Sequence, residues 1–155
     1  MNDKKSILAI DPGPQVCGWV VMQRDGSIDA GVCDTTQLLF SMIEADVMAI
    51  ERFEARGMPL GDESLQTLIV TGRLMQRWID DGGGRVIEVR RSEVKRALCG
   101  SAKATDANIR AALIDRYGGK VAAIGRKHSP GPLYGVKSHA WAALAVAVVT
   151  QGSLL

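Results

Sequence analysis

The chain has 155 residues, of which 46% are hydrophobic and 23% charged, a composition typical of folded globular domains. A domain of this length buries roughly 68–70% of the surface of its unfolded chain, so it needs no disulfide or metal ion to fold. The longest apolar run covers residues 140–149, whereas a membrane-spanning helix takes roughly 18 or more. We therefore expect a single domain over residues 1–155, without membrane contact and located in the cytoplasm.

The net charge of +2 hides an uneven distribution along the chain. Residues 1–84 carry 7 basic and 13 acidic side chains, whereas residues 85–137 carry 12 basic and 4 acidic ones. With only 5% aromatic residues, the basic block indicates contact with the backbone of a polyanion rather than stacking on unpaired bases. A solvated basic face is the alternative interpretation.

The first third of the chain predicts strands separated by turns. An apolar run over residues 6–10 ends at Asp11-Pro12-Gly13, where proline blocks the strand and glycine allows a tight turn. The Asp-Gly step within residues 24–27 predicts a hairpin between strands over 17–23 and 28–33. These three strands form an antiparallel meander.

The rest of the chain predicts alternating helices and strands. Thr35 or Thr36 is expected to cap a helix over residues 37–44, and a helical crossover makes the next strand parallel to another one. From there we expect, in order, a strand over 47–50, a helix over 62–81, a strand over 86–89, a basic helix over 92–98, a helix capped by Thr105, a mobile loop over 118–137 and an Ala-rich, fully buried helix from Ser138. This order predicts a mixed sheet between helices.

Asp11 and Glu51 each follow an apolar strand directly. If the two strands are parallel neighbours, about 4.8 Å apart, both carboxylates emerge at one edge of the sheet. Such a pair can hold divalent metal ions for hydrolysis of a phosphodiester. Alternatively, Asp11 only begins a turn and Glu51 only ends a strand at the surface.

Five segments, taken in order along nearly the whole chain, resemble the RuvC-type Holliday junction resolvases. They are Ile7-Leu8-Ala9-Ile10-Asp11-Pro12-Gly13 with Gly18-Trp19, Ala49-Ile50-Glu51, the strand and basic helix over 88–98, the turn over 100–104, and Ser138-His139-Ala140-Trp141 opening the last helix. The compact length and the segment over residues 57–61 look most like phage or prophage members of this family.

The resemblance implies an α/β, ribonuclease H-like fold, a mixed five-stranded sheet flanked by helices. It implies cleavage of Holliday junctions or other branched DNA by hydrolysis with two metal ions, Mg²⁺ or Mn²⁺. It also implies a homodimer, with the helix over residues 62–81 at the interface.

Carried over residue by residue, the resemblance assigns catalytic and metal-binding roles to Asp11, Glu51 and His139. The fourth position of the family's pattern, one helical turn after His139, is Ala142, where typical resolvases have Asp. Glu54 is a candidate for the missing carboxylate, or a solvent-facing loop residue. Asp34 is a weaker spare, expected in a turn or a helix cap.

Four basic side chains on two successive helices are candidates for holding DNA phosphates, or form a solvated face: Lys95, Arg96, Lys103 and Arg110. His128 is either a surface loop residue or a phosphate contact. Trp78 and Trp141 fit helical apolar patterns and are expected in the core.

Two other functions stay open. Ala142 is compatible with a catalytically reduced protein that binds junction DNA and uses the basic block for affinity. A ribonuclease H-like nuclease acting on RNA is a further possibility, because a metal site does not by itself specify the sugar.

Overall fold

The computed structural model describes residues 4–41 and 43–154. Its main sheet has five strands in the spatial order β3-β2-β1-β4-β5, namely β1 (Ile7–Asp11), β2 (Val16–Met22), β3 (Ile28–Asp34), β4 (Val47–Arg52) and β5 (Arg85–Arg90). The first three strands are antiparallel, and β1, β4 and β5 are parallel to one another. The mixed five-stranded sheet predicted from the sequence is confirmed.

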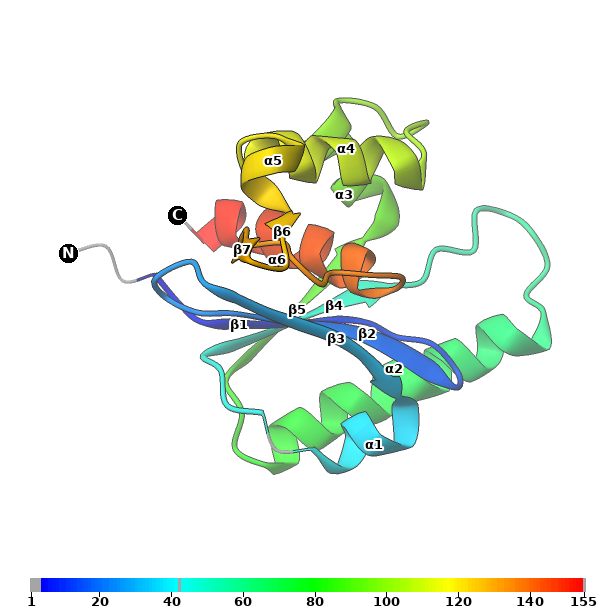
Figure 1. The fold of residues 1–155 in the computed structure, drawn as a ribbon. Helices are drawn as coiled ribbons and strands as arrows, with labels where there is room; N and C mark the ends of the chain where they lie inside the picture. The colour runs from blue at the N-terminus through cyan, green and yellow to red at the C-terminus, as the bar shows by residue number, and fades with distance from the viewer. Residues whose placement is uncertain (1–3, 42, 155) are drawn as a thin grey trace.

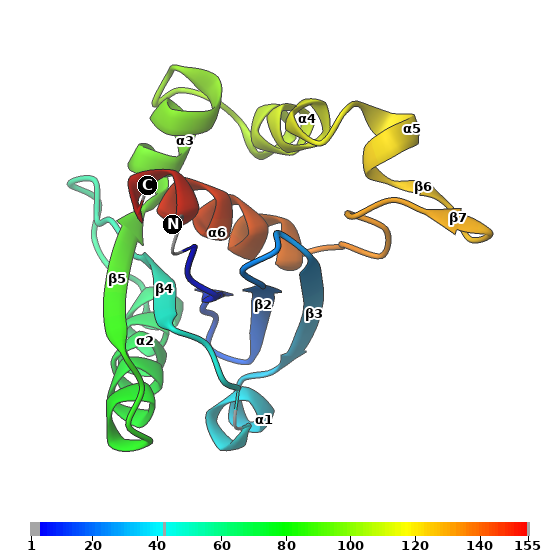
Figure 2. The same ribbon diagram turned by 90° about the vertical axis from the view of Figure 1, so that its left-hand side faces the viewer.

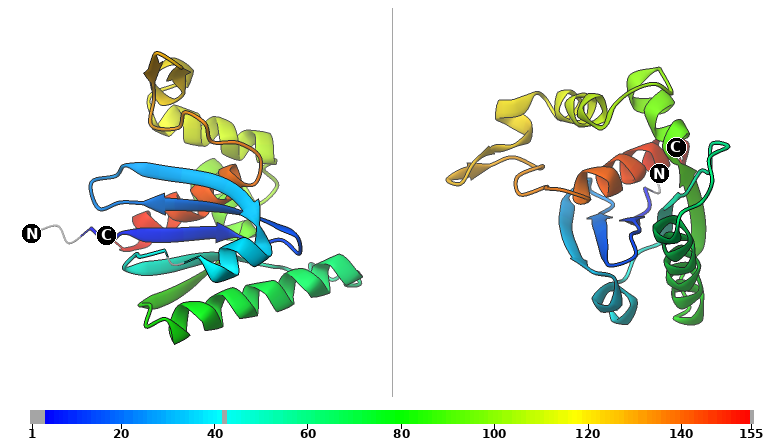
Figure 3. Two further views of the ribbon diagram at one scale, coloured as in Figure 1. Left: turned by 60° about the horizontal axis from the view of Figure 1, so that its bottom comes forward. Right: turned by 90° about the vertical axis from the view of Figure 1, so that its right-hand side faces the viewer.

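Helices cover both faces of this sheet (Figures 1 and 3). The helices are α1 (Thr35–Phe40), α2 (Asp62–Asp80), α3 (Arg91–Cys99), α4 (Asp106–Arg116), α5 (Lys120–Ala123) and α6 (Ala140–Leu154). α1 and α2 lie on one face, and α6 lies on the other beneath α3 and α4. In the described part of the chain, no helix combines the length and apolarity needed to cross a bilayer.

The sheet separates two apolar cores, because alternate residues of each strand point to opposite faces. Ile7 and Ala9 of β1 belong to the core shared with α6, whereas Leu8 and Ile10 pack toward α1 and α2. As the Ala-rich sequence predicts, α6 is buried along most of its length. Small side chains let this helix pack closely on the strands and carry its first turn to the end of β1.

Two predicted segments differ from the structure. α1 spans Thr35–Phe40 instead of residues 37–44. The expected cap at Thr35 or Thr36 is wrong, because the Asp34 carboxylate caps the helix by accepting a 2.8 Å hydrogen bond from the Thr36 amide, and the extended backbone of Ser41 ends it. The prediction of Asp34 as a cap is thus confirmed. The stretch over residues 118–137 is not an irregular loop: it forms α5 and a short hairpin of β6 (Gly125–Arg126) and β7 (Ser129–Pro130).

Candidate active site at the carboxyl edge of the sheet

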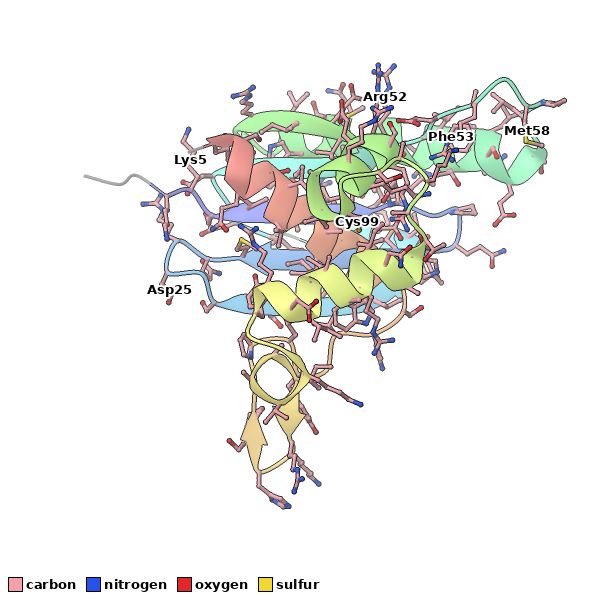
Figure 4. All side chains as sticks on the ribbon, turned by 90° about the horizontal axis from the view of Figure 1, so that it is seen from above. Lys5, Asp25, Arg52, Phe53, Met58 and Cys99 are labelled. Carbon is pink, nitrogen blue, oxygen red and sulfur yellow. The ribbon has the colours of Figure 1, made fainter. Side chains whose placement is uncertain are left out.

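Asp11 and Glu51 lie at the same edge of the sheet, as the strand pattern predicts. β1 and β4 are parallel and paired through Ile10 and Ile50, one residue before the two carboxylates. β5 runs beside β4 with Val89 opposite Glu51, so its last residues reach the same edge. Three parallel strands therefore end in charged residues at one place, and the connection after Glu51 leads to a projecting loop with Phe53 and Met58 (Figure 4).

Gly18 allows His139 to reach this edge. Gly18 pairs with Asp11 across β1 and β2, and a Cβ atom at Gly18 would lie 2.2 Å from the backbone oxygen of His139. Only glycine therefore lets the start of α6 pack on β2 at this point. The preceding Ser138 has a φ of +49°, a strained backbone conformation that residues other than glycine rarely adopt outside functional sites and turns.

Asp11 and His139 are in direct contact. Nδ1 of His139 lies 3.1 Å from Oδ2 of Asp11, a distance at which the imidazole N–H donates to the ionised carboxylate. Burial raises the pKa of Asp11 above its ordinary value, while the hydrogen bond and charge of His139 act in the opposite direction. Asp11 is thus a desolvated carboxylate whose main partner in the structure is the half-exposed histidine.

Glu51 is the most perturbed carboxylate of the site. Burial, and next the charge of Asp11, raise its pKa to about 7, and Arg91 acts against this shift. Nη1 of Arg91 lies 3.3 Å from Oε2 of Glu51, and the other terminal nitrogen of Arg91 pairs with Asp106. The two carboxylates are close enough to raise each other's electrostatic energy, so a cation at this edge is stabilising.

A cavity of about 480 Å³ opens over these residues. Helices α2, α3, α4 and α6 complete its walls with charged and polar side chains in addition to Asp11, Glu51 and His139, namely Glu63, Thr67, Arg91, Asp106, Arg110 and Ser138. Both signs of charge meet in it. A group that carries negative phosphate oxygens and needs a cation between itself and the carboxylates fits this chemistry.

Ala142 lines the same cavity, one turn after His139 on α6. Glu54 does not line it: its Oε1 accepts a 2.5 Å hydrogen bond from the Ser92 hydroxyl, and its other oxygen lies 3.7 Å from Arg56. The Ser92 hydrogen bond lowers the pKa of Glu54. These contacts hold the Glu54 side chain against Ser92 of α3, outside the cavity lining. The assignment of Glu54 as a metal ligand stays a prediction.

The four basic residues expected to hold DNA are spread over α3, α4 and the turn between them. Arg110 lines the cavity, with its guanidinium carbon 4.7 Å from the centre of the Trp141 ring. Arg96 and Lys103 are exposed and Lys95 is half-buried, all outside the cavity lining. Trp141 is partly buried and packs against the core at its margin, with the Arg110 guanidinium over its ring, whereas Trp78 is buried as expected.

Arg91, Asp106 and Glu63 belong to the site but are not identified by motif reasoning. Arg91 had a detectable signal, because it directly follows the third parallel strand, just as Asp11 and Glu51 stand at or next to the ends of the other two. Asp106 and Glu63 open helices whose positions over the sheet depend on tertiary packing. Local sequence carries no information on that packing.

The site offers donor atoms of the kinds that bind Mg²⁺ and Mn²⁺. Two carboxylates and an imidazole suit these ions, Mn²⁺ most of all. In the described residues, however, no three His, Cys, Asp or Glu side chains converge on one point. His139 contacts Asp11, whereas Glu51 contacts Arg91. The residue types fit a metal ion, and the side-chain pairing shows which contacts a bound ion would replace.

No family model and no curated protein sequence matches the chain. Solved structures do: Thermus thermophilus RuvC has a TM-score of 0.60 at 20% identity, covering 96% of this chain and 95% of that one. The same protein in complex with a Holliday junction substrate gives a TM-score of 0.65 at 19% identity over 94% and 92% of the two chains. The yeast mitochondrial Holliday junction resolvase Ydc2 gives 0.52 at 11% identity over 94% and 76%.

These TM-scores and coverages establish a shared fold over nearly the whole of this chain. The parallel strands ending in Asp11 and Glu51, and the closing helix α6 packed against β2, are built on that fold. The chain has the ribonuclease H-like fold of the RuvC Holliday junction resolvases.

Proposed function

We propose that the protein is a metal-dependent endonuclease that cuts Holliday junctions or other branched DNA. The observation that carries this proposal is the pair of desolvated carboxylates, Asp11 and Glu51, at one edge of a RuvC-type fold, with His139 in contact with Asp11. Fold alone does not specify function, and the chemistry of these three residues supplies what the fold leaves open.

Asp11, Glu51 and His139 would hold Mg²⁺ or Mn²⁺. When bound, two such ions supply an activated water for in-line attack on phosphorus and neutralise the leaving 3′ oxygen. The chain contributes the geometry: adjacent strands fix the two carboxylates, and the packing of α6 on Gly18 fixes His139. Burial of Asp11 and Glu51 excludes competing solvent and strengthens their attraction for a divalent cation.

The cationic side chains of the cavity would orient the DNA strand. Arg91 is held between Glu51 and Asp106, and Arg110 rests on the Trp141 ring, so both guanidinium groups are positioned beside the carboxylates. A phosphate entering the cavity would replace the acidic partners of Arg91 with a bidentate anion and would add an anionic partner to Arg110. Lys95, Arg96 and Lys103, farther along α3 and the following turn, would hold neighbouring phosphates.

Resolution of a four-way junction requires two incisions, and we propose that a homodimer makes them. One side of α2 packs Val70, Thr71, Leu74 and Trp78 into the core, while four apolar side chains on the helix stay exposed: Leu65, Leu68, Ile69 and Ile79. A second copy of α2 would cover this face across a two-fold axis. Light scattering should show a dimer; a monomer both free and with junction bound would contradict paired incision.

Cleavage of end-labelled DNA tests the proposed activity. We expect nicks in a four-way junction in Mg²⁺ or Mn²⁺, none in EDTA, and far weaker cutting of a linear duplex of the same sequence. The same junction with one strand replaced by RNA tests the RNA alternative. Equal cutting of linear and branched DNA would contradict structure selectivity.

Ala142 favours a second candidate, a protein that binds junctions and has a reduced catalytic site. The cavity contains no acidic side chain from α6, and Arg91 already neutralises part of Glu51. This protein would bind the four-way junction tightly and leave it uncut in every metal. Cytoplasmic location and membership of the phage or prophage type stay predictions in either case.

A further inference from the structure

Residues 120–130, between α4 and α6, form an arm that the proposed cleavage site does not use. It consists of α5 and the β6–β7 hairpin of residues 125–130, which turns at Lys127 and His128. The hairpin projects beyond the β3 edge of the sheet, away from the loop that carries Phe53 and Met58 (Figures 2 and 4). Every residue from Arg126 to Pro130 is exposed.

The base of the hairpin is fixed to the core, so its direction is built into the fold. Ala123 and Leu133 are buried, and the Leu133 amide donates a 2.8 Å hydrogen bond to the Ala123 carbonyl. The Gly131 amide donates to the Ile124 carbonyl at 2.9 Å, and a Cβ atom at Gly131 would lie 2.3 Å from the backbone oxygens of residues 122 and 123. A glycine is required there for the two segments to meet.

The charge of this arm has one sign. The sequence has no Asp or Glu after Asp115, whereas four basic residues follow within the arm and its connection to α6: Lys120, Arg126, Lys127 and Lys137. Among the described residues, none of these four forms an ion pair, while the arginines at 52, 77 and 91 all do. An exposed, unneutralised basic projection attracts a polyanion.

The features of the arm favour a DNA duplex over unpaired strands. Stacking on unpaired bases is strongest on Phe, Tyr and Trp rings, and residues 125–130 contain none of these. A two-stranded ribbon with basic residues at its turn matches the dimensions of a DNA groove lined by phosphates. The chain after the hairpin leads through Lys137 to Ser138 and His139, which connects the arm directly to the proposed cleavage site.

We propose that the β6–β7 hairpin holds the phosphate backbone of a duplex arm of the branched DNA, at a distance from the incised phosphate. This inference rests on the proposed function for the identity of the substrate. It assigns a second DNA-binding element that is separate from the cavity and from α3 and α4.

The test compares two double substitutions that remove the same charge. Arg126→Ala with Lys127→Ala alters the hairpin, and Lys4→Ala with Lys5→Ala alters the residues before β1 at another part of the surface (Figure 4). Binding is measured by fluorescence anisotropy on four-way junctions whose arms shorten in steps of one helical turn, about 10 base pairs. Arg126→Lys with Lys127→Arg checks that charge rather than packing is responsible.

On the longest arms, the hairpin variant should make the slope of log affinity against log salt less steep. The magnitude of the slope should fall by about 1.8, or 0.9 for each of two phosphates that the variant no longer neutralises. The control and the charge-preserving variant should keep the wild-type slope. On the shortest arms the hairpin variant and the wild type should bind equally.

Three outcomes would overturn the proposal: an unchanged slope on long arms, an equal reduction in affinity at every arm length, or a reduction as large for single-stranded DNA of the same length. Failure of the proposed function gives a different result. In that case the wild type shows no preference for junctions over linear duplex and cuts neither, whatever the hairpin does.

Discussion

The carboxyl edge of the sheet and the β6–β7 hairpin hold opposite arrangements of charge. At the edge, Asp11 and Glu51 are desolvated and each is paired, with His139 and Arg91 respectively. In the hairpin, Arg126 and Lys127 are exposed and have no acidic partner among the described residues. Mixed, buried charge suits chemistry at one phosphate, whereas exposed charge of one sign suits affinity for many phosphates.

The largest effect is expected at the edge itself. Glu51→Gln removes a carboxylate that would bind the metal ion, so cleavage should fall by about a thousandfold, equivalent to the several kcal/mol that metal ions contribute. Junction affinity should stay the same or rise, because the substitution removes a negative charge near phosphate. Rates are measured in single-turnover cleavage assays.

Glu88→Gln is the matched control, since Glu88 lies on the neighbouring strand β5, paired with Arg52 outside the cavity. It should cut at the wild-type rate. Glu54→Gln examines the remaining candidate ligand. A Glu51→Gln variant that cuts normally would place the chemistry elsewhere, and loss of cutting with Glu54→Gln would show that Glu54 is a ligand despite its hydrogen bond to Ser92.

The buried charge of the edge should also appear in the stability of the metal-free protein. The folded state raises the pKa of Glu51 from 4.5 to about 7, so it binds a proton more tightly than the unfolded state between these values. The free energy of unfolding should therefore fall as pH rises through this window, by about 1–3 kcal/mol, since one pKa unit corresponds to about 1.36 kcal/mol.

Urea denaturation in EDTA at a series of pH values measures this fall. Glu51→Gln should flatten the dependence, whereas Glu88→Gln should leave it unchanged. Burial shifts the pKa of Asp11 in the same direction and adds to the effect. Constant or rising stability from pH 5 to pH 7 would contradict the assigned burial of these carboxylates.

Ala142→Asp sharpens the comparison by adding charge to the edge. Residues three apart on a helix share one face, so the new carboxylate would join His139 in the cavity. We expect about a tenfold gain in cleavage rate from improved metal binding, and a lower melting temperature in EDTA than in Mn²⁺. Ala142→Asn, which adds similar volume without charge, should give neither effect.

Calorimetric titration with Mn²⁺ follows the affinity of the Ala142→Asp variant directly. If its metal affinity and its cleavage rate both equal those of the wild type, the interpretation of a reduced, resolvase-like site is wrong.

The smallest effect on cleavage is expected from the basic residues outside both regions. Replacing Lys95, Arg96 and Lys103 together by Ala should make junction binding less dependent on salt. The magnitude of the slope of log affinity against log salt should fall by about 0.9 for each phosphate that these side chains neutralise. At low salt and high protein concentration the cleavage rate should change little. An unchanged slope would remove α3 and the following turn from the DNA interface and leave the hairpin as the main DNA-binding element outside the cavity.

The sequence predicts the site better than it predicts the arm, for physical reasons. Apolar strands that end in Asp11 and Glu51 are local signals, and parallel pairing follows from the crossover between them. The hairpin has two-residue strands and many Gly and Pro residues, so its local pattern resembles a loop. Its order comes from burial of Ala123 and Leu133, which are tertiary contacts.

The same distinction applies within the site. His139 is placed by a close approach between α6 and Gly18, which the resemblance of two short segments anticipates. Asp106 and Arg110 reach the cavity only because α4 packs above α6. Such packing depends on many residues at once, and no single motif reports it.

The most direct test of the separation between chemistry and binding uses Asp11→Asn. Its affinity for a labelled four-way junction and its single-turnover cleavage rate are measured in parallel with those of the wild type in Mn²⁺. We expect Asp11→Asn to bind the junction at least as tightly as the wild type, with no detectable cleavage. Cleavage by Asp11→Asn at the wild-type rate would contradict the assignment of the carboxyl edge as the catalytic site.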